Sequence, residues 1–184
     1  SWQKWVYKLA SCLGGGLLIG IMEEFFFRGF IFTSLRDKVL RGSVPLAMVA
    51  TSLFYASVHF VSIRKPVISA DPGFMDSLKM IAAPVQSFAD WQAVWPAAIG
   101  LFLFGMVLNY CAVRTRSLYA SIGLHAGAVF FVRTIGLFIS FLEKNVFFWS
   151  TKKVYDGVLG WAFLLLVGFL MSKLLKKADP LQTV

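Results

Sequence analysis

The chain has 184 residues, of which 58% are hydrophobic and 16% aromatic, and its mean hydropathy is +0.73. Soluble domains are nearer about 45–50% apolar, so one small core cannot bury this excess. The composition therefore excludes an ordinary soluble domain and indicates an integral membrane protein. The net charge of +9 does not indicate a nucleic-acid partner, because the basic residues form short clusters between apolar stretches, as in loops at a membrane surface.

The first half of the chain predicts two spanning helices and a long loop. A spanning helix needs about 20 mainly apolar residues, and the first such stretch is 10–34. A polar turn is expected to end it, formed by Arg36, Asp37, Lys38, Arg41 and Gly42. The second stretch is 44–62, and Pro45 near its start favours a helix N-terminus. Acidic residues and prolines interrupt 66–91, which predicts a loop with an interfacial or re-entrant helix near 74–82.

The second half predicts three more spans, at 92–113, 117–142 and 157–175, with charged residues between the last two. The fold class is therefore all-α, a polytopic transmembrane bundle of about five spanning helices. We expect one membrane-embedded domain over 1–184, in which 143–184 form a loop and the last span. Residue 1 is Ser rather than Met, so the sequence is expected to begin inside a longer protein or after processing.

Seven polar residues lie inside the predicted apolar spans. An ionisable side chain at the centre of a bilayer costs roughly 2.5 to 3.5 kcal/mol on insertion scales, so each one is a candidate functional residue. The set comprises Glu23, Glu24, Arg28, His59, Asn109, His125 and Arg133.

Helical spacing separates the two adjacent acids of this set. Glu24 and Arg28 are four residues apart, in the favourable order for an ion pair on one face. Glu23 lies about 100° around the helix from Glu24 and needs another partner. His59 and His125, the two histidines of the chain, are the candidates for that partner.

A glutamate with two histidines is compatible with two kinds of chemistry. One is metal binding, although no HExxH sequence is present and a catalytic zinc usually has three protein ligands with supporting contacts. The other is metal-free hydrolysis, in which Glu23 is the general base for a water that His59 helps to hold. His125 would then donate toward the developing oxyanion. Cys12 and Cys111 stand apart in apolar stretches, which implies neither a disulfide framework nor a thiolate site.

Three short stretches, taken in order, resemble the motifs of one membrane-protease family. "EEFFFRG" (23–29), "YASVHF" (55–60) and "SIGLHAGAVFF" (121–131) are similar to the EExxxR, FxxxH and HxxxN motifs of the CPBP family. This family of CAAX proteases and bacteriocin-processing enzymes is also called the Abi family, and the resemblance spans about residues 10–135. It implies an intramembrane glutamate endopeptidase that needs no metal and no other cofactor.

The resemblance also implies a role for each motif residue. Glu23 corresponds to the activating carboxylate, His59 to the histidine that shares its water, and His125 to the histidine on the oxyanion side. Glu24 and Arg28 correspond to supporting positions of the first motif.

Two positions depart from the family pattern. Tyr55 stands at the aromatic position of FxxxH and adds a hydroxyl, while Val129 stands at the asparagine position of HxxxN and cannot donate a hydrogen bond. Losing one oxyanion donor typically costs ~10²–10³ in rate. Asn109, Ser57 and Tyr55 are the polar candidates to replace that donor.

Two further functions compete with the protease. Val129 and the high aromatic content favour a non-catalytic relative that packs as a subunit or assembly factor within a larger membrane complex. Buried Glu, His and Arg side chains are also compatible with a transporter or proton relay, although the chain shows no inverted repeat.

The partners expected for the protease are the lipid bilayer and a membrane-associated peptide or protein substrate, with no nucleic acid. The style of the motifs suggests the inner (cytoplasmic) membrane of a bacterium.

Overall fold

The computed structural model describes residues 2–61, 73–82, 91–138, 148 and 155–175, and every regular element within these ranges is helical. In chain order the elements are α1 (Trp2–Glu24), η1 (Phe25–Phe32), η2 (Leu35–Val39), α2 (Val44–Val58), α3 (Phe74–Ala82), α4 (Trp91–Thr115), α5 (Tyr119–Phe138) and α7 (Val158–Leu174). The stretches η1 and η2 are π-helical and continue α1 as one long helix. The predicted all-α class is confirmed for the described part of the chain.

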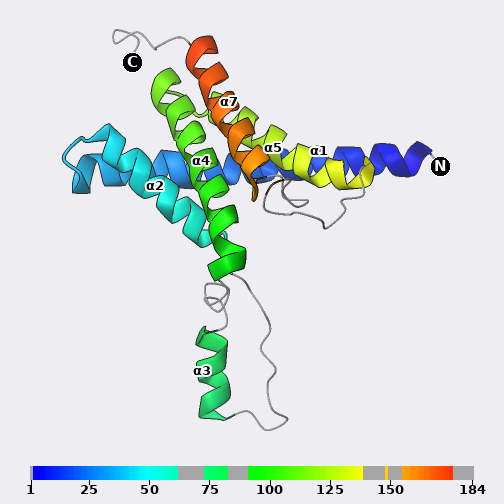
Figure 1. The fold of residues 1–184 in the computed structure, drawn as a ribbon, viewed down its shortest axis with the longest axis horizontal. Coiled ribbons are helices and arrows are strands. Elements are labelled where there is room, and N and C mark those ends of the chain that lie inside the picture. Colours follow the sequence, from blue (N-terminus) through cyan, green and yellow to red (C-terminus); the bar gives the residue numbers. More distant parts are fainter. Residues whose placement is uncertain (1, 62–72, 83–90, 139–147, 149–154, 176–184) are drawn as a thin grey trace.

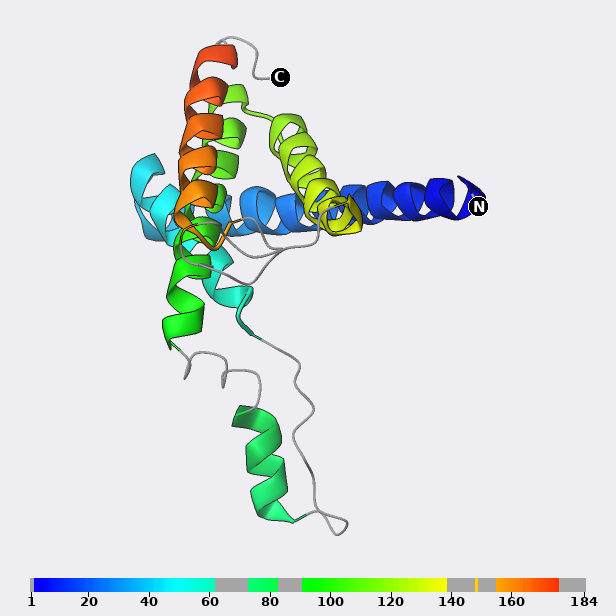
Figure 2. The same cartoon turned by 45° about the vertical axis from the view of Figure 1, so that its right-hand side comes forward.

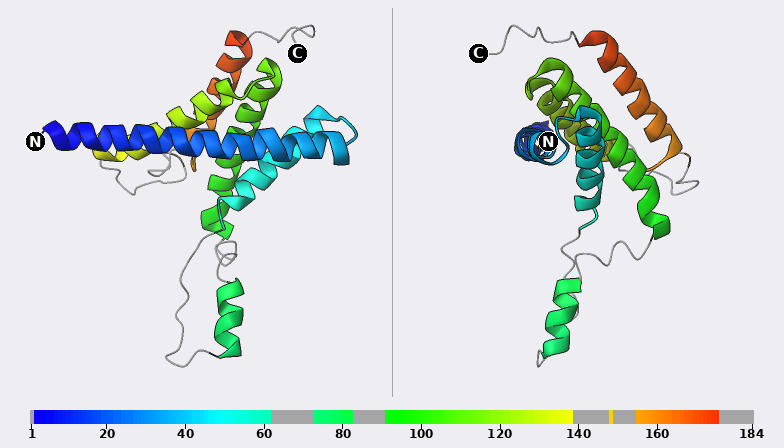
Figure 3. Two further views of the ribbon diagram at one scale, coloured as in Figure 1. Left: turned by 180° about the vertical axis from the view of Figure 1, so that it is seen from behind. Right: turned by 90° about the vertical axis from the view of Figure 1, so that its left-hand side faces the viewer.

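The helices cross one another around the middle of the long α1–η1–η2 helix (Figure 1). The N-terminal half of this helix packs along α5, and its C-terminal half contacts α2. α4 contacts α2, α5 and α7, and α4 and α7 run side by side at a steep angle to α1 (Figure 2). Figure 3 shows α3 standing apart from the other helices. The centre of the bundle is therefore the region where the α1–η1 junction, α2, α4 and α5 meet.

Two of the helices are long and apolar enough to cross a bilayer, namely Trp2–Val39 and Val94–Thr115. Three further apolar helical stretches are shorter, Val44–Val58, Tyr119–Ile135 and Val158–Leu174. A span needs about 17–25 residues, so the longer two of these three reach the lower limit. Many large apolar side chains on α1, η1 and α7 remain exposed, as expected of a surface that faces lipid. The membrane helix bundle is thus confirmed, while the number of five spans and the single domain over 1–184 stay predictions.

The first helix extends further than the sequence predicted. We expected 10–34, ended by a polar turn from Arg36 onward, but the helix runs from Trp2 to Val39. Arginine and lysine are good helix formers, and Arg36 is paired with Asp37, donating from Nε to Oδ1 at 2.6 Å and from Nη2 to Oδ2 at 2.9 Å. The paired charges do not break the helix, and the turn comes only at 40–43.

The second helix is shorter than predicted. It begins at Val44 with Pro45 in its first turn, as expected, but ends at Val58 rather than at residue 62. The amides of Phe60 and Val61 bond to carbonyls three residues back, so His59 stands where the helix tightens and stops. The helix predicted at 74–82 is confirmed as α3; the rest of the predicted loop lies outside the described residues.

The other helices agree closely with the sequence. α4 extends the predicted 92–113 by one residue at its start and two at its end. α7 agrees with 157–175 to within one residue at either end. α5 covers 119–138 of the predicted 117–142, and positions 139–142 are not among the described residues.

α1 and α5 approach closely because two buried glycines of α1 face α5. A Cβ atom on Gly16 would lie 2.9 Å from the Ala126 carbonyl oxygen and 3.3 Å from the Phe130 amide nitrogen. A Cβ atom on Gly20 would lie 3.0 Å from the Ala126 amide nitrogen and 3.2 Å from the Ile122 carbonyl oxygen. Small residues at this spacing are a common means of close helix packing in membranes. They bring the backbone of α5 directly against α1.

Replacing Gly16 with alanine is expected to lower the free energy of unfolding by about 1–3 kcal/mol, because backbone atoms of α5 have to move. Gly14→Ala is the matched control, since a Cβ atom there meets nothing within 4 Å while the gain in helix propensity is the same. Equilibrium unfolding of the detergent-solubilised chain measures both. Equal stability of the two variants would show that the α1–α5 contact is looser than described.

Candidate functional site

The Glu24 carboxylate lies at the centre of the bundle and contacts two side chains, an arginine and a histidine. Its Oε1 atom is 3.0 Å from Nη1 of Arg28 and 2.8 Å from Nδ1 of His125. Nη2 of Arg28 donates to the Gly105 carbonyl oxygen at 3.2 Å. Glu24, Arg28 and His125 are all buried, with at most 2% of each residue exposed. The predicted Glu24–Arg28 pair is present, and it extends to α5 and α4.

Local sequence explains why these groups meet. Gly16, Gly20, Glu24 and Arg28 follow one another at four-residue steps, so they share one side of the helix. The glycines admit α5 closely enough for His125, next to Ala126 in sequence, to reach Glu24. Gly105 has the same role on α4, because a Cβ atom there would lie 3.2 Å from the backbone and side chain of Ser52 on α2.

The partners of the two histidines assign their tautomers. Nδ1 of His59 is 2.8 Å from the Tyr55 carbonyl oxygen, which can only accept, so Nδ1 carries the hydrogen. Nδ1 of His125 faces Glu24 Oε1, an atom that also accepts from Arg28, so this nitrogen donates as well. In both rings Nδ1 is therefore engaged, and Nε2 is the nitrogen that can interact with a further group.

Glu23 faces those two Nε2 atoms. Its Oε2 atom is 3.7 Å from Nε2 of His125 and 3.9 Å from Nε2 of His59. Within the described residues this buried oxygen has no hydrogen-bond partner. The distances are too long for direct hydrogen bonds and leave a position that a bridging group such as a water would satisfy. The Glu23 and His59 side chains are 31% and 29% exposed, whereas His125 is 3% exposed, so the position is approached from the Glu23–His59 side.

The two acids are less separate than the helical spacing predicted. We expected Arg28 alone to pair with Glu24, and His125 to be a partner of Glu23. The His125 ring contacts both carboxylates, with Nδ1 on Glu24 and Nε2 toward Glu23. Two adjacent acids that point to different sides of a helix can still contact the two ends of one imidazole.

Tyr55 is the aromatic packing residue of the centre. Its ring lies 4.4 Å from the His59 ring and 6.2 Å from the His125 ring, between centroids. The Arg28 guanidinium carbon lies 4.9 Å from the Tyr55 ring centroid, a cation–π distance. Phe27 packs edge-on against Tyr55 at 5.0 Å. The Tyr55 ring thus packs against both imidazoles and against the Arg28 guanidinium.

Asn109 and Ser57 have other hydrogen-bond partners. Nδ2 of Asn109 donates to the Met48 carbonyl oxygen at 3.1 Å and to Ser52 Oγ at 3.0 Å. Both amide hydrogens are therefore engaged with α2, and Asn109 has none left for an oxyanion. Ser57 donates within its own helix, to the Leu53 carbonyl oxygen. Neither residue fits the expectation that it replaces the amide missing at Val129.

Three contacts were missed by the sequence argument. The Gly105 carbonyl carries no side-chain signal at all, and the Glu24–His125 bond joins residues 101 positions apart. Phe104, which packs edge-on against His125 at 5.5 Å, could not be told from other apolar residues of α4. In the described part of the chain, no cluster of His, Cys, Asp and Glu has the arrangement of a metal site.

Comparison with known proteins gives the family. Residues 5–131, more than half of the chain, match the family model described as "Type II CAAX prenyl endopeptidase Rce1-like". The match contains all three motifs. It also contains every residue of the Glu–His centre, the name we give to Glu23, Glu24, Arg28, His59 and His125. No curated protein and no solved structure matches the chain significantly.

The membrane helix bundle and the family match together define the class of the protein, which is that of the CAAX-type intramembrane proteases. The chain belongs to the type II CAAX prenyl endopeptidase Rce1-like family, which confirms the resemblance drawn from the motifs.

Replacing Arg28 with methionine is expected to lower the free energy of unfolding by about 3–5 kcal/mol, because it leaves the buried Glu24 without its counter-charge. Adding Glu24→Gln to this variant should restore part of the loss by removing the stranded charge. Arg36→Met, which removes a partly exposed arginine paired with Asp37, is the control and should change stability little. Chemical unfolding of the four proteins measures this; a double variant less stable than Arg28→Met would contradict the expectation.

Proposed function

We propose that the chain hydrolyses a peptide bond of a membrane-associated protein or peptide, with Glu23 as the general base. One observation carries this proposal: the buried Oε2 atom of Glu23 has no hydrogen-bond partner among the described residues and lies within 4 Å of Nε2 of both histidines. Family membership supports a protease but does not name its catalytic residues.

The proposed first step activates a water between Glu23 and His59. With the hydrogen of His59 on Nδ1, both Glu23 Oε2 and His59 Nε2 accept, so a water donates one hydrogen to each. Glu23 takes one proton as the water oxygen bonds to the carbonyl carbon of the substrate. Glu23 then passes that proton to the leaving amine as the C–N bond breaks. The products are a carboxylic acid and an amine, and Glu23 ends as it began.

His125 is proposed to bind the oxyanion that forms in this step. Its Nδ1 hydrogen is engaged with Glu24, so a donor at Nε2 requires the imidazolium form. Glu24 lies 2.8 Å from Nδ1 and supplies the negative charge that such a cation needs. Because Val129 offers no amide, the proposal assigns the donation to the oxyanion to His125.

The family description suggests the first substrate to try, a peptide with a C-terminal prenylated CAAX sequence. The non-catalytic alternative, a subunit or assembly factor of a larger membrane complex, is not favoured by the family match. The inner membrane of a bacterium remains the proposed location.

Glu23→Gln is expected to lower cleavage of such a peptide by roughly 10²–10⁴-fold, the usual contribution of a general base. His59→Ala and His125→Ala should also lower cleavage strongly. Asp37→Asn is the control, because this exposed carboxylate pairs with Arg36 on the same helix. The assay uses purified chain in liposomes and measures product by mass spectrometry. Cleavage by Glu23→Gln equal to that of the unmodified chain would refute the proposed base.

Chelators are expected to leave cleavage unchanged, because the proposed base and donors are protein groups. The measurement compares activity before and after treatment with phenanthroline, with metal analysis of the purified chain. A zinc protease in the same buffer is the positive control. Loss of activity that added zinc restores would instead favour a metal held by Glu23 and the two histidines.

A further inference from the structure

A cavity of about 690 Å³ lies beside the Glu–His centre, on the other side of Arg28. Its walls come from η1, η2, the first residue of α2, the last turn of α4 and the turn between α4 and α5. The volume falls within the roughly 300–1,000 Å³ typical of sites for organic ligands. Its polar lining residues are Arg28, Thr33, Arg36, Arg114, Arg116 and Ser117.

Four arginines line the cavity, and the lining contains no acidic residue. Arg28 is paired with Glu24, and Arg36 is paired with Asp37. Arg114 donates to the Leu175 carbonyl oxygen at 3.3 Å. Over the described ranges, neither Arg114 nor Arg116 forms an ion pair. Among the residues that the structure describes, two positive charges therefore line the cavity without an acidic partner.

One buried group supports a ligand there. Nε of Arg28, on a side chain that is 2% exposed, is buried and finds no hydrogen-bond partner in the described structure. Arg116 has a φ angle of +51°, in the left-handed region where glycine is normally preferred after a helix. Arg41 has the same φ angle in the turn after η2, so this conformation belongs to the helix-ending turn and is not by itself evidence for a ligand.

The remaining lining indicates an amphiphilic ligand. Phe32, Val44 and Leu118 form apolar wall beside the arginines. The cavity sits where membrane helices end in basic turns, and basic pockets between such helices bind anionic lipid headgroups. Arginine pairs well with phosphate because its planar fork matches the phosphate oxygens.

We propose that this cavity binds the phosphate-bearing headgroup of an anionic membrane lipid, with Arg114 and Arg116 as its main cationic contacts. The apolar wall takes the first part of the acyl chains, and Thr33 and Ser117 supply hydroxyl contacts. This binding is independent of the proposed catalysis.

The test titrates the purified full chain, in a neutral detergent, with phosphatidylglycerol or with phosphatidylcholine of the same acyl chains. Native mass spectrometry measures the bound lipid. One phosphatidylglycerol should bind at least about tenfold more tightly than phosphatidylcholine. Arg114→Gln combined with Arg116→Gln should weaken phosphatidylglycerol binding about tenfold or more.

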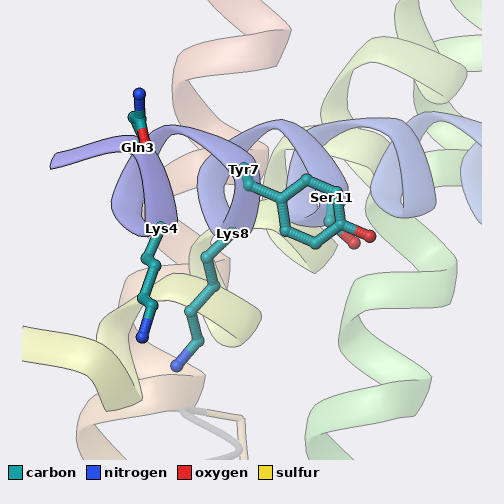
Figure 4. Close-up of a pocket in the computed structure, with 5 residues that line it drawn as sticks. All are labelled: Gln3, Lys4, Tyr7, Lys8 and Ser11. Atoms are coloured by element: carbon teal, nitrogen blue, oxygen red, sulfur yellow. The ribbon is translucent and has the colours of Figure 1, made fainter. Parts of the chain in front are cut away.

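The matched control removes two basic residues far from the cavity. Figure 4 shows Lys4 and Lys8 extending from the same side of α1 near its N-terminus, where they line a depression formed by that helix alone. Lys4→Gln with Lys8→Gln removes the same charge and should change binding less than about twofold, since exposed charges beyond a Debye length are screened. Equal losses in the two double variants would overturn the proposal, because they would show a general effect of net charge.

A second variant fills the cavity without changing charge. A Cβ atom on Gly29 would lie in ordinary contact, 3.7 Å from Leu118 Cδ1, so Gly29→Leu can begin its side chain there and should also weaken phosphatidylglycerol binding about tenfold. Equal binding of the two lipids would overturn the proposal. Competition by inorganic phosphate alone, or by a peptide with a free but not an amidated C-terminus, would assign the cavity to those ligands instead of a lipid.

Discussion

The Glu24 carboxylate, buried and shared by Arg28 and His125, is the interaction on which the rest of the centre depends. Its two partners come from η1 and α5, and Arg28 continues to the Gly105 carbonyl on α4. A buried charge that loses its partner costs several kcal/mol, so these helices have one favourable relative position. That position places Glu23, one residue earlier, opposite Nε2 of both histidines. The charged centre thus sets the geometry of the proposed catalytic group.

Local patterns in the sequence were enough to predict much of this. Four-residue spacing identified the Glu24–Arg28 pair, and apolar stretches located α4, α5 and α7 to within a few residues. These features depend on neighbours in the chain, which the sequence displays directly. The motif order then named a family that the comparison confirmed. The catalytic roles drawn from that resemblance remain proposals.

Contacts between distant residues could not be predicted in the same way. The choice of His125 as partner of Glu24 depends on how closely α5 approaches, which Gly16 and Gly20 decide through backbone contacts. The end of the first helix was misplaced because Arg36 and Asp37 were taken as chain-breaking charges. Arginine and lysine are good helix formers and Arg36 is paired with Asp37, so charge by itself does not end the helix.

Val129 gives the Glu24–His125 bond a further consequence for the proposed mechanism. In the family pattern an asparagine stands at this position, and valine cannot donate a hydrogen bond. The oxyanion then depends on His125, which can donate from Nε2 only while Nδ1 also keeps its hydrogen. Glu24 accepts that second hydrogen at 2.8 Å and carries the charge opposite to the resulting imidazolium. In the proposed mechanism, the carboxylate that holds the helices together would therefore also be the group that makes His125 a suitable donor.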